Sequence, residues 1–124
     1  MHGRLQLAIF LGGAGGGLAR AALERASPAD GHSWPWVTFA VNIAGTALLA
    51  YLAKRIGGWP LARPLLGIGF CGALTTFSTL QLEALELVHD HHPGLGAAYA
   101  VSSIAAGLLV TRAVSAFAGR RPVQ

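Results

Sequence analysis

Four long apolar stretches, separated by short polar links, dominate the hydrophobic pattern of the chain. One charged residue, Arg20, falls within residues 5–23, and none falls within 34–53, 64–82 or 93–111. A helix needs about 20 mainly apolar residues to cross the hydrocarbon core of a bilayer. The pattern therefore predicts an all-α membrane protein, one domain over residues 1–124, with transmembrane helices at about 4–24, 34–54, 62–88 and 94–117.

The composition also favours lipid as the natural solvent. Hydrophobic residues make up 53% of the chain and charged residues only 11%, whereas soluble domains carry about 25% charged residues. The alternative is an unusually apolar soluble bundle. Trp34 and Trp36 open the second stretch as interfacial aromatic residues do, which supports the membrane interpretation.

The basic residues lie at the ends of the stretches, so lipid headgroups and topology explain the net charge of +4 better than nucleic acid does. With four spans, both ends of the chain lie on one side of the membrane. The other side carries all five acidic residues, with Arg25 and at most Arg20 as basic residues. The positive-inside rule then predicts cytoplasmic termini in a plasma (inner) membrane, on a side that carries Arg4, Lys54, Arg55, Arg63, Arg112, Arg120 and Arg121.

The third stretch has an unusual composition for a membrane helix. Gly67, Gly69 and Gly72 lie close together and precede the hydroxyl-rich run at 75–79. Glycine and β-branched threonine weaken a helix in mid-span, and hydroxyl groups can bond to the carbonyl groups that a break frees. Each unsatisfied backbone group in lipid costs on the order of several kcal/mol, so a broken helix needs such hydroxyl groups nearby. We therefore predict that this helix is broken near its middle. A plain, kinked span is the alternative.

Polar residues on the other stretches are candidates either for contacts between helices or for contacts with an ion. The glycine run at 12–17 suits close helix packing. Arg20, one turn later, either snorkels to the headgroups or acts within the membrane. Asn42 must find hydrogen-bond partners inside the membrane, on a second-stretch face that it shares with Thr38. On the fourth stretch, small or hydroxyl residues recur every four positions at Tyr99, Ser103, Gly107 and Thr111.

The sequence does not indicate an enzyme. It contains no arrangement typical of nucleophilic or paired-carboxylate catalysis, and the glycine run lacks the Lys-Ser/Thr of a phosphate-binding loop. Histidines surround Asp90 in a polar turn, where a solvated loop is favoured over a metal site. The single cysteine, Cys71, cannot form an internal disulfide bond.

Three motifs, in their order and spacing, resemble those of the Fluc/CrcB fluoride channels, and together they cover almost the whole chain. The first two are short and common patterns, Gly12-Gly13-x-x-Gly16-x-x-x-Arg20 and Val41-Asn42-x-x-Gly45. The third is long and specific: residues 69–79 read Gly-Phe-Cys-Gly-Ala-Leu-Thr-Thr-Phe-Ser-Thr.

The resemblance implies a passive channel that exports cytoplasmic fluoride and so relieves its toxicity. It implies an antiparallel, dual-topology-type dimer with two pores between subunits. It also implies a structural sodium ion at the dimer centre, held by the backbone carbonyls of Gly72 and Thr75. Arg20 matches a structural or vestibule arginine of the family, and Glu83 matches a pore-mouth glutamate. The pore positions would be Thr38, Asn42, Phe77, Ser78, Thr79, Leu80, Tyr99 and Ser103.

Leu80 departs from the family pattern, which has a second phenylalanine there. Aromatic ring edges carry partial positive charge and can face an anion, and leucine has no such edge. The departure leaves open an altered pore, or one impaired pore in a dimer of this chain with a paralogue rather than with itself. Ala73, where the family usually has glycine, is a milder change.

Two other functions are considered. A non-conducting or heterodimer-only channel subunit would be consistent with Leu80. A small drug/proton antiporter would need a carboxylate within its first span, where this chain has Arg20 and no acidic residue before Glu24.

Overall fold

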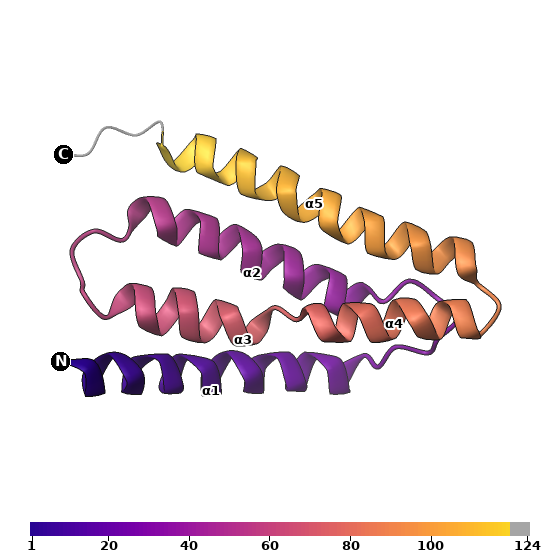
Figure 1. The fold of residues 1–124 in the computed structure, drawn as a ribbon, viewed down its shortest axis with the longest axis horizontal. Coiled ribbons are helices and arrows are strands. Elements are labelled where there is room, and N and C mark those ends of the chain that lie inside the picture. The colour runs from indigo at the N-terminus through magenta and orange to yellow at the C-terminus, as the bar shows by residue number, and fades with distance from the viewer. Residues whose placement is uncertain (120–124) are drawn as a thin grey trace.

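The computed structural model describes residues 1–119 and is all helical over them (Figure 1). The third predicted span consists of a π-helix that continues into a short α-helix and, after an interruption, a second α-helix. The helices agree within a few residues with the four predicted stretches: α1 (His2–Ala26), α2 (Trp36–Arg55), the third span as η1 (Arg63–Cys71), α3 (Gly72–Leu74) and α4 (Phe77–His89), and α5 (Pro93–Gly119).

The four long helical segments lie side by side, and the third span changes its neighbours at the break (Figure 1). Before the break, η1 and α3 pack against α1 and α2. After the break, α4 packs mainly against α5, and among the described residues it makes no contact with α1. The two halves of one span therefore belong to different packing environments.

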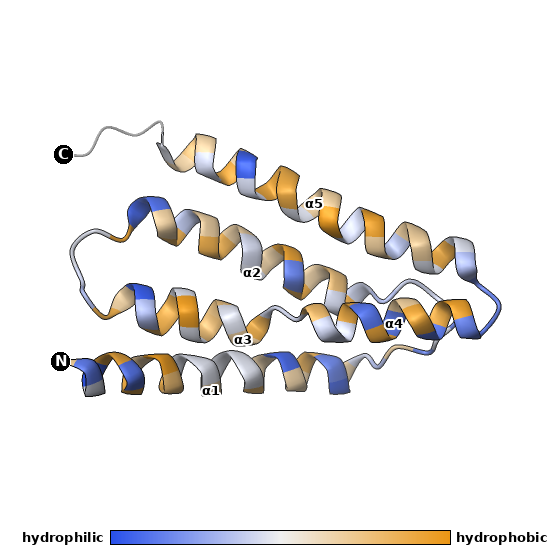
Figure 2. Cartoon of the chain, in the orientation of Figure 1, coloured by the Kyte–Doolittle hydropathy of each residue, from blue (hydrophilic) through white to orange (hydrophobic). Residues whose placement is uncertain are grey.

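Three of the helical segments are long and apolar enough to cross a membrane: α2, the third span from Arg63 to His89, and α5. Only 11–28% of their most apolar portions is buried within the chain, so most of this apolar surface is left for lipid or another protein. The 25-residue α1 is long enough but is not among these three; its glycine run, Gln6 and Arg20 all lower its mean hydropathy. Figure 2 shows this run as the pale middle of α1.

The glycines of the first and third spans allow two backbones to touch. A Cβ atom added to Gly12 would overlap the carbonyl oxygen of Leu65, and one added to Gly16 would overlap that of Phe70. From the other side, a Cβ on Gly69 would lie 2.6 Å from the Ile9 carbonyl oxygen. The predicted packing face of α1 is thus confirmed, and its partner is η1, which winds as a π-helix, a form usually limited to a single turn.

The start of α1, the end of α2, the start of η1 and the end of α5 lie at the same end of the bundle (Figure 1), and basic residues gather there. Arg4, Lys54, Arg55, Arg63 and Arg112 occupy these helix ends. Arg120 and Arg121, which the sequence assigns to the same side, lie outside the described residues. The distribution within residues 1–119 follows the predicted charge bias.

Candidate functional site

The third span breaks at Thr75 and Thr76, as predicted from the glycine and threonine content. Both residues have extended backbone, with φ/ψ of −79°/147° at Thr75 and −147°/119° at Thr76. The Thr76 hydroxyl then caps α4 by accepting a 3.2 Å hydrogen bond from the backbone N–H of Thr79. This is the side-chain cap expected of threonine at a helix start.

Asn42 on α2 holds the break through both backbone groups of one residue. Its Oδ1 accepts a 2.7 Å hydrogen bond from the Thr76 N–H, and its Nδ2 donates a 3.1 Å bond to the Thr76 carbonyl oxygen. These two bonds fix the orientation of the amide. With both bonds to Thr76 made, one Nδ2 hydrogen of Asn42 is still available to donate to another partner.

Other side chains also bond to backbone carbonyls around the break. Arg20 Nε donates to the Ala73 carbonyl oxygen at 3.0 Å, and Thr75 Oγ1 donates to that of Cys71 at 2.9 Å. Arg20 also pairs with Glu24 at 3.3 Å. The Gly72 and Thr75 carbonyl oxygens lack the usual helical bond from four residues later, because the Thr76 N–H donates to Asn42 Oδ1 and the Thr79 N–H donates to Thr76 Oγ1.

A cavity of about 230 Å³, called here the break pocket, lies beside the broken segment. Helix α5 contributes Ser103, whose hydroxyl oxygen is buried and has no partner within the described residues. The break pocket brings together four of the predicted pore residues and adds Thr46, which was not assigned to the pore. Its lining comprises Asn42, Thr46, Thr75, Thr76, Phe77, Leu80, Ser103 and Ile104.

A second polar cluster centres on a buried carboxylate, Glu83 on α4. The Thr38 hydroxyl donates to Oε1 and the Tyr99 hydroxyl donates to Oε2, both at 2.7 Å. The exposed fractions are 1% for Thr38, 8% for Glu83 and 0% for Tyr99. These bonds join α2, α4 and α5, and they satisfy a group that is costly to bury unpaired.

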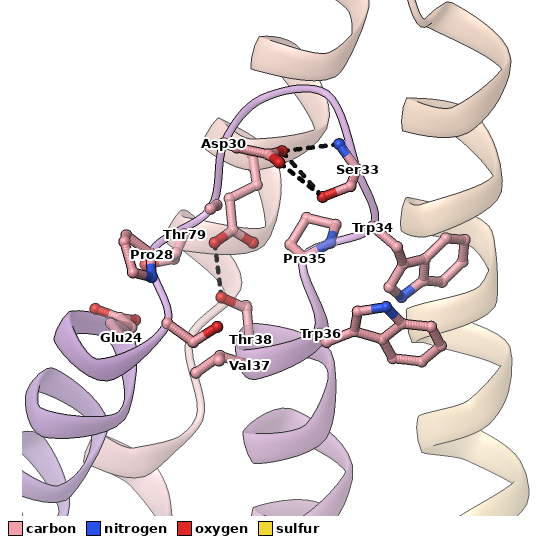
Figure 3. A pocket seen from close by; sticks show the side chains of 13 residues that line it. Glu24, Pro28, Asp30, Ser33, Trp34, Pro35, Trp36, Val37, Thr38 and Thr79 are labelled. Carbon is pink, nitrogen blue, oxygen red and sulfur yellow. Dashed lines mark hydrogen bonds between the residues drawn. The ribbon is translucent and has the colours of Figure 1, made fainter.

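A cavity of about 330 Å³, called here the loop pocket, opens between the α1–α2 loop and this cluster (Figure 3). Thr38, Thr79 and Glu83 line it from the helices, and Glu24 lines it from the end of α1. Asp30 shapes the loop, since the backbone N–H groups of His32 and Ser33 donate to its Oδ1 at 2.8 and 2.9 Å. Hydrogen bonds to the charged form lower the pKa of Asp30 below its usual value.

Trp34 covers the Tyr99 side of this cluster. Its ring meets those of Tyr99 and Phe39 edge to face, each with a centroid distance of 5.5 Å. The sequence identified Trp34 only as an interfacial residue. No local pattern signals its contact with a tyrosine 65 positions later, since that contact depends on how α5 returns along α2.

The remaining predicted positions surround the start of α4. Phe77 is 64% exposed, and Ser78 is exposed with its hydroxyl 3.3 Å from that of Thr76. Thr79 Oγ1 accepts a 3.1 Å bond from Thr76 Oγ1. Neither pocket is lined by Arg20. Within residues 1–119, the polar lining of the break pocket is therefore made of neutral amide and hydroxyl groups, with no charged side chain.

Comparison with known proteins identifies the family. A family model described as "CrcB-like protein, Camphor Resistance (CrcB)" matches residues 7–115. The chain belongs to the CrcB family. It is 55% identical over 106 residues to the fluoride-specific ion channel FluC 1 of Mycolicibacterium paratuberculosis, and 51% identical to that of Mycobacterium bovis; each match covers 82% of this chain and 80% of the relative. It is 41% identical to FluC 2 of Thermobifida fusca, over 90% of this chain and 84% of the relative.

CrcB membership confirms the family that the three motifs indicated. It also confirms that the chain is a multi-pass membrane protein of a channel family and not an enzyme. The individual pore, vestibule and sodium residues stay predictions. The structure shows where these residues lie in this CrcB chain and which of them share a pocket.

Proposed function

We propose that this chain is a fluoride-selective passive channel that lets cytoplasmic fluoride leave the cell. The observation that carries the proposal is the break pocket, where neutral donors from α2 and α5 meet in mid-span. The relatives named as fluoride-specific ion channels support the choice of ion. Fluoride that enters acidified cells as the neutral acid dissociates inside, and the anion then leaves down its electrochemical gradient.

The donor chemistry of the pocket suits a small, strongly hydrated anion. A selective pore must replace the hydration shell without holding the ion too tightly. Asn42 offers one remaining amide hydrogen, and Ser103 offers a buried hydroxyl without a partner within the described residues. Arg20 would bind the anion harder, and it is engaged with Ala73 and Glu24 instead.

An antiparallel dimer would complete each pore. One chain leaves most of its apolar spans unburied and the break pocket open on one side. In this arrangement α1 serves as the fourth span, and its length of 25 residues allows it to cross the bilayer. The second subunit would close the pocket against lipid and keep the anion among polar groups.

The carbonyl groups at the break fit a structural sodium ion. Hard cations prefer oxygen ligands, and the Gly72 and Thr75 carbonyl oxygens lack the usual helical bond from four residues later. Gly72 is exposed, so its backbone can be reached by a second subunit. A bound sodium ion would supply positive charge that satisfies these carbonyls, and Arg20 would hold the neighbouring Ala73 carbonyl in place.

The decisive test of the function is fluoride efflux from liposomes that contain only this chain, followed with a fluoride electrode. We expect rapid fluoride efflux once a potassium ionophore dissipates the membrane potential that opposes it, and little chloride efflux. Fluoride retention by liposomes with correctly folded protein would contradict a homodimeric channel and favour the heterodimer-only or non-conducting subunit. Proton-coupled cation uptake would instead support the antiporter.

If the chain has a fixed orientation in the cell, as the charge bias predicts, its antiparallel partner there would be an oppositely oriented paralogue, whereas liposomes that contain only this chain test pairing with itself. We expect a membrane-impermeant reagent to label a terminal tag from one side of the membrane only. Equal labelling from both sides would show that the chain inserts in both orientations, and would support a homodimer.

A further inference from the structure

We propose that Thr46 is an additional fluoride-binding residue, which acts with Ser103 across the break pocket. Its hydroxyl would raise the affinity of the pore for fluoride. The assignment rests on the proposed fluoride function. It arises from the location of the two hydroxyl groups: Thr46 lies on α2, one turn beyond Asn42, and Ser103 lies on α5, and both line the same cavity of about 230 Å³.

The two hydroxyls differ from those of Thr75 and Thr111, which bond to their own helices. A threonine within a helix commonly bonds to the carbonyl four residues earlier, as Thr75 does at 2.9 Å and Thr111 at 2.8 Å. Thr46 makes no such bond to Asn42 in the described structure, and the buried Ser103 Oγ has no partner there. Each hydroxyl is therefore available to donate into the pocket.

The opposite wall explains why these donors matter in this chain. Leu80 closes the pocket from α4, with 6% of its surface exposed. An aliphatic side chain offers neither a donor nor a positive ring edge. Beyond Phe77 and the break residues Thr75 and Thr76, the pocket is lined by α2 and α5, whose hydroxyl donors there are Thr46 and Ser103.

The test compares fluoride efflux and its dependence on fluoride concentration for Thr46→Val, Thr46→Ser and wild type in liposomes. Valine keeps the shape of threonine but loses the hydroxyl, so we expect about a tenfold loss of flux at low fluoride, the order expected for one hydrogen bond to a charged group. A higher half-saturating concentration should accompany the loss. Serine keeps the hydroxyl and should retain at least half of the flux.

Thr111→Val is the matched control, because Thr111 bonds its own helix and is not a lining residue of the break pocket. The assignment would be overturned if Thr46→Val behaved like wild type, or if Thr46→Val and Thr46→Ser lost equal flux. Flux through the wild-type chain in the same experiment would still support the channel function. A folded wild-type chain without flux would overturn the proposed function and this assignment together. An unchanged melting temperature for Thr46→Val would exclude misfolding as the cause of its loss.

Discussion

The third span carries two different kinds of structure on the two sides of its break. Before it, η1 and α3 are apolar and meet α1 through glycines, backbone against backbone. After it, α4 meets its neighbours through side-chain hydrogen bonds, with Glu83 joined to Thr38 and Tyr99. Figure 2 shows the contrast as polar colour along α4 beside the more apolar helix before the break.

The difference indicates a division of labour. The half before the break packs on α1 mainly through backbone atoms, so it can anchor the fold, and it offers an ion backbone carbonyls such as that of Gly72 rather than side-chain donors. The half after the break has polar groups that can exchange partners. Asn42 joins the two, because it binds Thr76 where one half gives way to the other. Substitutions should therefore affect folding on one side and conduction or local stability on the other.

The largest effect is expected at the glycine interface. Gly12→Ala would place a methyl group onto the Leu65 carbonyl oxygen, and relief requires the two helices to separate. We expect about 3 kcal/mol of destabilisation, the upper end of the usual cost of overpacking, and loss of the monodisperse peak in size-exclusion chromatography. Gly17→Ala is the control, since nothing lies within 4 Å of the added atom. Equal behaviour of the two variants would refute the backbone contact.

Asn42→Asp should remove conduction while leaving the glycine interface intact. A carboxylate cannot donate to the Thr76 carbonyl oxygen, and its charge would repel an anion. Loss of one such bond, worth about 1–3 kcal/mol, together with this repulsion should lower flux at least about a hundredfold. Liposome efflux measures the effect, and Gln6→Glu repeats the amide-to-carboxylate change at an exposed site on α1. Wild-type flux through folded Asn42→Asp would exclude the proposed role.

Thr38→Val should weaken the half after the break without collapsing the fold. It leaves one carboxylate oxygen of the 8%-exposed Glu83 without its 2.7 Å partner, and an unsatisfied buried acceptor costs about 1–3 kcal/mol. We expect a lower melting temperature in detergent. Thr111→Val, which loses only a bond within its own helix, should melt close to wild type. If both variants melt alike, the Glu83 cluster contributes no special stability.

The sequence predicted the features that depend on local composition. The charge-free runs predicted the helices, glycine and threonine content predicted the break, and the glycine run predicted a packing face. Hydropathy was less informative for α1, because glycines that serve packing also dilute an apolar segment. The stretch with a single charge at residues 5–23 still predicted a first span at about 4–24.

The site was predictable as a set of residue types but not as a set of contacts. Asn42 was recognised as a polar group needing partners, with helix packing and ion binding both open. The pairing with Thr76, 34 positions later, depends on the register between α2 and the third span, which no local pattern fixes. The same holds for Thr46, whose pocket exists only because α5 packs beside α2.

The smallest effect is expected at Leu80, where the chain departs from its family. Leu80 packs against Tyr99 in the core and also borders the break pocket, so a larger ring has a cavity to enter. The ring edge would add a partly positive contact for an anion. We expect Leu80→Phe to conduct fluoride as well as wild type or up to about threefold better, since such a contact is worth about 0.5 kcal/mol. Leu82→Phe, at a 57%-exposed position, should leave flux unchanged; a folded but closed Leu80→Phe channel would show that the leucine is needed for an open pore.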